Sequence, residues 1–345
     1  MKALKGILVF IVKNKITTHQ SSSEWILEKI KALVDASEEL VAVSEVHYPG
    51  HAWSIVKLLL LWGWVYVYTT IIPKHFNNYQ YIDLLAGSGT TYVEETKDVV
   101  AGSPFIAHFF ARNPFRSYVY VEKRHDRSEA LRRRATRVIG ENAHVLEGDC
   151  NELIQTTLPQ EKRSHSLLFI DNEGFDVVWN TIEAILEANT DVLILFPTSS
   201  VMRVAKSDRT WSSLNRFYGN ESWRDAQDEE DFLEIYLQQL KERFEALRQK
   251  QVYISDVRVG TGQFFYDIIL TCKRGPYIRA WQYLKKRLDW KDPRTIETTL
   301  DILKGRATRI DWFLDLDERV ASIRGEARTE DAKRTTLDDF LEPET

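Results

Sequence analysis

The stretch Tyr81-Ile82-Asp83-Leu84-Leu85-Ala86-Gly87-Ser88-Gly89 decides the fold. Its nearly continuous apolar residues are typical of a buried strand that runs straight into a glycine turn. Glycine permits a positive φ angle and lets a ligand approach the backbone closely. In an open parallel sheet, ligands bind beyond the carboxyl ends of the strands. We therefore expect a cofactor at this turn, bound by Asp83, Ala86, Gly87, Ser88 and Gly89.

The sequence after the turn alternates between strand and helix patterns. Apolar runs predict strands at residues 118–122, 143–146, 167–171 and 192–196, with helices at residues 103–111, 126–139 and 177–186. This alternation indicates a parallel sheet with helices on both faces. Two later runs, at residues 252–257 and 264–270, have only a short glycine-containing link between them, which predicts an antiparallel hairpin. Parallel strands followed by such a hairpin are the arrangement of Rossmann-like methyltransferases.

Acidic residues lie at the ends of successive predicted strands. Glu122 ends the second strand, where a carboxylate can accept hydrogen bonds from both hydroxyls of a ribose. Asp149 follows the third strand, within reach of an adenine amine, and Asp171 ends the fourth beside the expected methyl donor. Each acid alone could be a helix cap, and a lone glycine turn could be only a tight turn. Their recurrence at one edge of the sheet favours S-adenosylmethionine (SAM) as the cofactor.

The turn lacks the signatures of two other nucleotide sites. No Gly-Lys-Ser/Thr follows it, which argues against ATP hydrolysis. Its spacing is not Gly-x-Gly-x-x-Gly, which argues against NAD. Cys150 is counted with Asp149 among the cofactor-binding residues, and its thiol is either a nucleophile for carbon methylation or a small buried side chain. No metal is expected.

Residues 81–89 resemble the first motif of the three-Cys-motif partner protein family, which are predicted class I methyltransferases. The buried fourth strand, the final hairpin and the helical N-terminal segment are also similar, so the resemblance covers roughly residues 50–290. The resemblance implies a Rossmann-like fold and SAM binding, and it leaves the substrate undefined. That family tends to have Pro after the fourth-strand Asp, whereas this chain has Asp171-Asn172-Glu173-Gly174. The departure argues against amino methylation of DNA.

The same run supplies the candidate catalytic residues, which are Asp171, Asn172 and Glu173. Asp171 or Glu173 can act as a general base or orient the acceptor. For Glu173 the alternative is a carboxylate that caps a helix starting near residue 175.

Composition restricts the class of protein. The 345 residues are 43% hydrophobic, enough for a sizeable core in roughly two domains or one domain with additions. A net charge of −5 excludes a generally basic nucleic-acid binder, so any polyanion site must be a local patch. Two distant cysteines exclude a disulfide framework and a Cys-rich zinc module, and they fit a reducing cytoplasm.

Two apolar segments predict neither a signal peptide nor a membrane span. Residues 7–12 are flanked by lysines and lack a cleavage pattern. Residues 58–72 form a run of 15, shorter than the ~20 residues of a span, and contain repeated Trp and Tyr. A buried helix is therefore predicted, and no membrane partner is expected.

The expected fold class is α/β: a Rossmann-like class I methyltransferase sheet of parallel strands and a C-terminal antiparallel hairpin, with helical additions at both ends. The methyltransferase domain is placed at residues 77–290, after a helical N-terminal segment at 1–76. Within it, residues 198–250 form a helical insertion. A C-terminal helical extension follows at 291–325, and a charged, disordered tail at 326–345.

The insertion is the candidate for substrate recognition. Its basic side chains alternate with aromatic ones, which suits nucleic acid because charges meet phosphates and rings stack on bases. The alternative is a packed subdomain with a solvated basic rim. A second basic run, from Arg124 to Arg137, is more typical of a solvated helix face. The residues expected to bind substrate are Arg203, Arg209, Trp211, Arg216, Phe217 and Tyr218.

The tail carries a short motif at residues 334–341, which resembles the archaeal form of the peptide that binds the sliding clamp PCNA. Leu337, Phe340 and Leu341 fall on one face of a helical turn, as a hydrophobic pocket requires. Arg334 stands where that motif usually has Gln. The alternative is a terminal turn that docks on its own domain.

These patterns together predict a cytoplasmic SAM-dependent methyltransferase that acts on nucleic acid, with DNA favoured, and is recruited by PCNA. Two alternatives stay open. One is a methyltransferase of RNA or protein, in which the terminal motif is incidental. The other is a catalytically silent scaffold that binds SAM.

Overall fold

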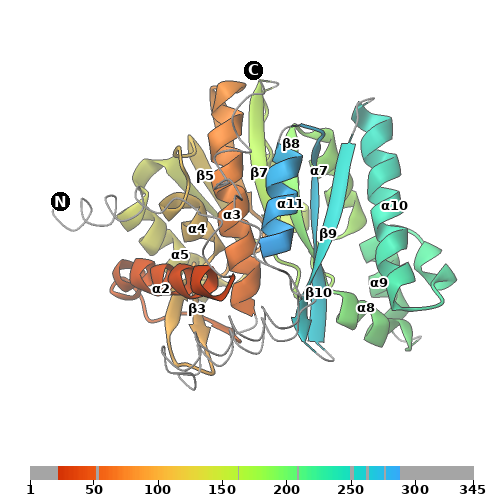
Figure 1. The fold of residues 1–345 in the computed structure, drawn as a ribbon, viewed down its shortest axis with the longest axis horizontal. Helices are drawn as coiled ribbons and strands as arrows, with labels where there is room; N and C mark the ends of the chain where they lie inside the picture. The colour runs from red at the N-terminus through yellow and green to blue at the C-terminus, as the bar shows by residue number, and fades with distance from the viewer. Residues whose placement is uncertain are drawn as a thin grey trace, which may run out of the picture.

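The fold is built on a seven-stranded sheet in the order β6-β5-β2-β7-β8-β10-β9 (Figure 1). The computed structural model describes residues 22–51, 54–161, 163–207, 210–248, 252–261, 264–275 and 277–287. The parallel strands are β2 (Asn78–Asp83), β5 (Ser117–Glu122), β6 (Ala143–Glu147), β7 (Ser164–Ile170) and β8 (Thr190–Phe196). β10 (Phe264–Lys273) runs antiparallel to both β8 and β9 (Val252–Thr261). This order and these directions confirm the predicted Rossmann-like methyltransferase sheet.

Helices cover both faces of the sheet, because alternate residues of its strands point to opposite layers. In β7, Leu167 and Phe169 belong to one apolar core, and Leu168 and Ile170 belong to the other. The first layer contains α2 (Ser22–Val41), α3 (Ile55–Ile71), α4 (Ser103–Phe109), α5 (His125–Val138) and α11 (Tyr277–Arg287). The second layer contains α6 (Cys150–Thr157), α7 (Trp179–Glu187), α8 (Thr198–Ala205), α9 (Trp211–Tyr218) and α10 (Glu229–Arg248).

A small second sheet lies next to the glycine turn, and the sequence did not predict it. β1 (Tyr48–Gly50) pairs in parallel with β3 (Thr90–Val93), which pairs antiparallel with β4 (Val99–Ala101). Strands of three or four residues are too short to show a period, so the prediction of a mostly helical segment at 1–76 missed β1. The pairing holds residues 42–51, here called the N-terminal strap, beside the turn.

α3 is the apolar helix that the sequence predicted to be buried. By length and composition, Ile55–Lys74 is the one described helix that could cross a membrane, but 78% of its most apolar window is buried. α3 packs against α2, α4 and α11. A helix that is apolar all round is typical of a protein core, and this burial accounts for its composition.

Several predicted features lie outside the described residues. They are the apolar run at residues 7–12, the extension at 291–325 and the tail at 326–345. The division of the chain into separate domains stays a prediction. Residues 198–207 and 210–248 do fold largely into helices, which pack against the second face of the sheet.

Candidate active site

A cavity of about 500 Å³ opens at the carboxyl ends of the strands, where the strand order reverses between β5 and β7. It joins segments that are far apart in the chain. Residues predicted for the site that line it are Ala86, Gly87, Ser88, Gly89, Glu122, Asp149, Cys150, Asp171, Asn172, Glu173 and Arg203. The predicted acids of three successive strands therefore share one cleft beside Gly87.

The glycine turn has the backbone conformation that its sequence predicts. φ is +60° at Gly87 and +85° at Gly89, angles that side-chain-bearing residues rarely adopt. A Cβ on Gly89 would lie 2.4 Å from Cε2 of Phe105, so any larger residue would also displace α4. At Gly87 a Cβ would lie 3.5 Å from the ring of Tyr48. Gly89 therefore serves the packing behind the turn, while Gly87 faces the strap.

Asp83 lies behind the turn and does not line the cavity. It is fully buried, and its carboxylate accepts hydrogen bonds from the Leu85 N–H and the Tyr81 hydroxyl, both at 3.3 Å. Burial raises the pKa of Asp83 to about 7. The prediction that Asp83 contacts the cofactor is wrong for this structure, because the turn covers its carboxylate. Its hydrogen bonds shape the turn instead.

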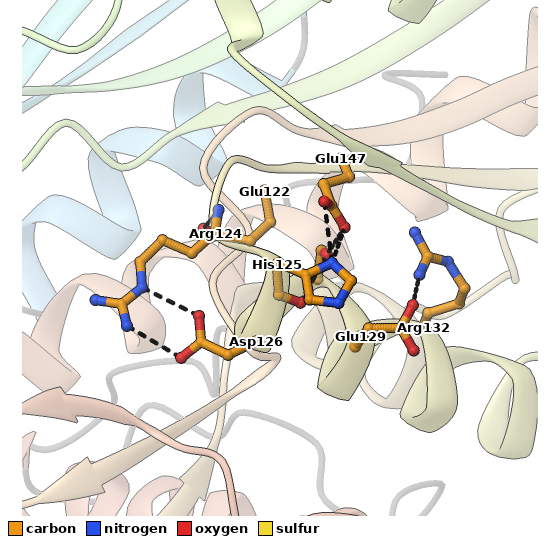
Figure 2. Close-up of polar contacts among 8 residues, drawn as sticks. Glu122, Arg124, His125, Asp126, Glu129, Arg132 and Glu147 are labelled. Atoms are coloured by element: carbon orange, nitrogen blue, oxygen red, sulfur yellow. Dashed lines mark hydrogen bonds and ion pairs between the residues drawn. The ribbon is translucent and has the colours of Figure 1, made fainter.

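Two carboxylates flank the turn on the side of β5 and β6. Glu122 is only 8% exposed, and its Oε1 accepts from the N–H of Arg124 at 2.8 Å (Figure 2). Asp149 accepts from the N–H of Asn151 at 2.9 Å and pairs with Lys123 Nζ at 3.0 Å. Burial opposes ionisation of Asp149, but these hydrogen bonds outweigh it and lower its pKa. Asp149 is thus both the cap of α6 and a charged part of the cavity wall.

Cys150 lines the cavity as a buried thiol. Burial, with the nearby charge of Asp149, raises the pKa of Cys150 to about 12. A thiol with that pKa yields very little thiolate at neutral pH. The structure therefore favours a small buried side chain over a nucleophile.

Lys57 of α3 brings a cation to the other end of the cavity. Its Nζ lies 2.5 Å from Oδ2 of Asp171, and the two side chains are only 13% and 16% exposed. No sequence pattern indicated Lys57, because the helix that carries it is far from β7 in the chain. Lys57, Asp171 and Asn172 are called the acceptor end of the cavity below.

Two buried polar atoms at the acceptor end have no hydrogen-bond partner within the part of the chain that the structure describes. They are Oδ1 of Asp171 and Nδ2 of Asn172. Asn172 is 2% exposed, and its Oδ1 accepts from the N–H of Val177 at 3.1 Å, which fixes the orientation of the amide. An unsatisfied buried polar atom costs about 1–3 kcal/mol. Both atoms are therefore covered by protein and unsatisfied, which is a cost that the fold bears beside the cavity.

Tyr48 of the strap links the two ends of the cavity. Its ring lies 4.4 Å from the guanidinium carbon of Arg127, and its hydroxyl donates to the carboxylate of Glu173. Protein atoms packed around that carboxylate, together with nearby Asp176, raise the pKa of Glu173 to about 7, although the residue as a whole is exposed. The alternative role of Glu173 as a cap near residue 175 is wrong, because α7 begins at Trp179.

Arg134 fastens the strap to the glycine turn. Its fully buried guanidinium donates to the carbonyls of Leu40 (2.9 Å), Ser44 (2.5 Å), Val46 (2.8 Å) and Ser88 (2.7 Å). Burial lowers the pKa of Arg134 to about 10, so it stays charged at neutral pH. One side chain thus joins the end of α2, the strap and the turn. The sequence placed Arg134 in a solvated basic run, which is wrong for this residue.

Arg127 of that run lines the cavity, whereas Arg124 and Arg132 fit the solvated face that the sequence predicted. Arg124 pairs with Asp126 at 3.0 Å, and Arg132 pairs with Glu129 (Figure 2). Both arginine side chains are more than 40% exposed. Their charges are offset by neighbouring carboxylates, so this face of α5 is not a strong polyanion site.

Two of the predicted substrate-binding rings are core residues. Phe217 and Tyr218 are both fully buried, and Phe217 stacks on Tyr236 of α10 with ring centroids 5.1 Å apart. They cannot stack on a base in this structure, so their prediction as substrate ligands is wrong. Alternating basic and aromatic residues on α9 reflect one buried face and one exposed face of an amphipathic helix.

The remaining residues predicted to bind substrate are dispersed. Arg203 of α8 is exposed and lines the cavity. Arg216 is exposed but does not line it. Trp211 is half-buried, and its ring is covered by the guanidinium of Arg224 at 4.6 Å. Arg209 lies outside the described residues, as do the clamp-binding candidates Leu337, Phe340 and Leu341.

Comparison with known proteins adds only distant likenesses. No family model matches the chain, and no curated protein matches it significantly. The O-methyltransferase TomG from Streptomyces achromogenes, in complex with SAM, has 12% identity and a TM-score of 0.38, over 79% of this chain and 96% of that one. An O-methyltransferase from Bacillus cereus, in complex with SAH, has 11% identity and a TM-score of 0.34, over 72% and 91%. No function follows from values this low, and membership of the three-Cys-motif partner family stays a prediction.

Proposed function

We propose that this protein is a SAM-dependent methyltransferase whose cofactor binds in the cavity beside the glycine turn. One observation carries the proposal. In a sheet with the strand order of methyltransferases, Glu122 and Asp149 line a single cavity with Gly87, at the carboxyl ends of the strands. Ligands of open α/β sheets bind at this point, where the strand order reverses.

The residues present fit this cofactor. Glu122, low in exposure and held by the Arg124 N–H, would accept from the ribose hydroxyls. Asp149, held in its charged form, would accept from the adenine amine. Positive φ at Gly87 keeps the turn free of a side chain on the cavity side. When bound, SAM supplies a methyl group on a positively charged sulfur, which a nucleophile can take.

Chemistry at the acceptor end would fall to Asp171. Lys57 holds Oδ2 of Asp171, which keeps this partly exposed carboxylate in the cavity wall. A carboxylate so placed can orient the acceptor and take its proton. Among the described residues, no group of three or more His, Cys, Asp or Glu side chains is placed to hold a metal ion.

Nucleic acid, with DNA favoured, is the proposed substrate class. Exposed Arg203 at the cavity and exposed Lys206 just beyond α8 support it, because cations at the mouth of a site meet phosphates. The burial of Phe217 and Tyr218 removes part of the sequence argument, so RNA or protein substrates stay as alternatives. Recruitment by PCNA through residues 334–341 is likewise a proposal that rests on the sequence motif alone.

Calorimetric titration with SAM tests the central proposal. Binding is expected, and it should weaken in Glu122→Ala and Asp149→Ala. Absence of binding to the folded wild-type chain would overturn the proposal and favour another ligand. Binding without transfer of labelled methyl to DNA, RNA or protein pools would favour the catalytically silent scaffold.

The proposed recruitment by PCNA is tested separately. A peptide of residues 330–345 should bind PCNA, and the double change Phe340→Ala with Leu341→Ala should abolish binding, because it removes the two bulky anchors of the motif. Calorimetry that detects no binding of the native peptide would remove PCNA from the proposal without affecting the cofactor site.

A further inference from the structure

The strap and the loop after β7 are in contact at the opening of the cavity. The hydroxyl of Tyr48 donates to the carboxylate of Glu173, which is 125 residues further along the chain. Both residues line the cavity. Tyr48 is half-buried and Glu173 is exposed, so their contact lies on the solvent side of the cavity and not in its floor. It is called the Tyr48–Glu173 bridge below.

The bridge crosses the edge of the sheet where the cofactor is proposed to bind. A Cβ on Gly87 would lie 3.5 Å from Cδ2 of Tyr48, so the tyrosine ring covers the glycine turn. The turn follows β2, the loop of Glu173 follows β7, and these two strands are neighbours in the sheet. A ligand that extends from Glu122 to Asp171 along this edge therefore has to pass the bridge when it enters or leaves.

The Tyr48 side of the bridge is held in place. Tyr48 pairs with Thr91 between β1 and β3, and the guanidinium of Arg134 binds the carbonyl of Val46, two residues earlier in the strap. The guanidinium carbon of Arg127 lies 4.4 Å from the centre of the Tyr48 ring. Contacts to the backbone and to the ring thus fix the hydroxyl without help from Glu173.

The Glu173 side has more freedom. Asn172, directly before it, is buried and fixed, because its Oδ1 accepts from the Val177 N–H at 3.1 Å. Gly174, directly after it, has room around it: a Cβ there would lie 3.9 Å from Oδ2 of Asp176 and within 4 Å of no other described atom beyond its chain neighbours. Glycine also permits more backbone conformations than any other residue. An exposed side chain beside such a glycine can move away without disturbing the core.

We propose that the Tyr48–Glu173 bridge is a gate, which opens by movement of Glu173 and must open before the cofactor can enter or leave the cavity. The inference rests on the proposed function for the identity of the ligand, and it adds how that ligand exchanges.

A gate has a kinetic signature of its own. Because the bridge closes both the empty and the loaded cavity, it slows association and dissociation by the same factor and leaves the affinity unchanged. Two other roles of Tyr48 would act differently. A ring that occupies the position of the cofactor would slow association alone, and a ring that contacts the bound cofactor would slow dissociation alone.

The experiment breaks the bridge from each side. Tyr48→Phe removes the hydroxyl and keeps the ring, and Glu173→Ala removes the carboxylate. Surface plasmon resonance on the immobilised full chain gives the association and dissociation rate constants of S-adenosylhomocysteine. We expect each variant to raise both constants about five-fold, the ratio that corresponds to a hydrogen bond of ordinary strength, with Kd within about two-fold of wild type. The double variant should be no faster than either single variant, because both changes break one contact.

Two matched controls lie near the bridge but outside the cavity wall. Tyr92→Phe removes the hydroxyl of a half-buried tyrosine in β3, and Glu45→Ala removes an exposed carboxylate of the strap. Both rate constants should stay within about two-fold of wild type in each control, since surface changes of this kind have small effects.

A second measurement needs no cofactor. Cys150 lines the cavity, whereas the other cysteine of the chain, Cys272, is buried and does not line it. Monobromobimane, a flat thiol reagent that becomes fluorescent on reaction, should therefore modify Cys150 about five-fold faster in Tyr48→Phe and Glu173→Ala than in wild type. Loss of this signal in Cys150→Ser assigns it to Cys150.

The outcomes separate this inference from the proposed function. A change in only one of the two rate constants, no change in either variant, effects that multiply in the double variant, or unchanged modification of Cys150 would each overturn the gate. If S-adenosylhomocysteine does not bind the wild-type chain, the proposed function fails instead, and the rate of Cys150 modification then decides for or against the gate.

Discussion

The two ends of the cavity differ in how their polar groups are satisfied. At the cofactor end, Glu122 accepts from the Arg124 N–H, and Asp149 accepts from the Asn151 N–H. At the acceptor end, buried atoms of Asp171 and Asn172 have no partner among the described residues. The carboxylates of the first end already have hydrogen-bond partners within the protein. The second keeps two buried polar atoms unsatisfied, and the comparison predicts that substitutions at the two ends act on different steps.

The largest effect should come from Asp171→Asn. It removes the proposed proton acceptor and the counter-charge of Lys57, so kcat should fall by about 10²–10⁴-fold. The dissociation constant of SAM should stay within about three-fold, because Asp171 belongs to the acceptor end. Methyl-transfer kinetics and calorimetry on the same preparation measure the two quantities. If kcat and the affinity for SAM fell by the same factor, the two ends of the cavity would not act on separate steps.

Arg134→Met should have the next largest effect, on stability. It leaves four carbonyl oxygens without their donor and unfastens the strap, so the free energy of unfolding should fall by roughly 3 kcal/mol. Urea unfolding measures it. Arg133→Met, at the exposed neighbouring position, should stay within about 0.5 kcal/mol of wild type. A small loss of unfolding free energy in Arg134→Met would show that the folded state does not depend on this fastening of the strap.

Glu122→Ala and Asp149→Ala should each weaken SAM binding about ten-fold, since each removes a charged acceptor from the cofactor end. Glu147→Ala is the matched control. That carboxylate ends β6 on the same edge, but it bonds His125 and Ser128 and does not line the cavity. Calorimetry should find its SAM affinity within about two-fold of wild type. A comparable loss of SAM affinity in all three variants would show that the effect comes from the loss of negative charge in general and not from contacts in the cavity.

The smallest effect concerns the pH dependence given by Asp83. Burial raises its pKa to about 7 from the ordinary 3.8, so between these pH values the unfolded chain releases a proton that the folded chain keeps. The contribution of Asp83 to the free energy of unfolding should therefore fall as pH rises from 4 to 7 and level off above. Asp83→Asn should flatten this fall. Parallel curves of unfolding free energy against pH for the wild type and Asp83→Asn would contradict this prediction.

The sequence predicts one part of this site well for a physical reason. Continuous apolar strands have a clear pattern, and parallel strands place their ends at one edge, so Glu122, Asp149 and Asp171 could be expected to meet. Lys57, Tyr48 and Arg134 could not be predicted, because their partners come from distant segments.

The sequence also does not show which of the candidate side chains are buried. Phe217 and Tyr218 have the composition of a stacking surface, but composition does not tell a core ring from an exposed one. Asp83 has the position of a ligand, yet the turn that follows it folds over its carboxylate. Tertiary packing decides all three cases.

The guanidinium of Arg134 also bears on where the folding unit begins. Because it connects α2, the strap and the glycine turn, and because α2 and α3 share one apolar core with the sheet, residues 22–76 are not a detachable leader. A shortened chain that starts at residue 77 would expose the apolar face of its sheet and should precipitate. The smallest independently soluble version of this protein should therefore retain the N-terminal helices, although they carry none of the glycine turn's chemistry.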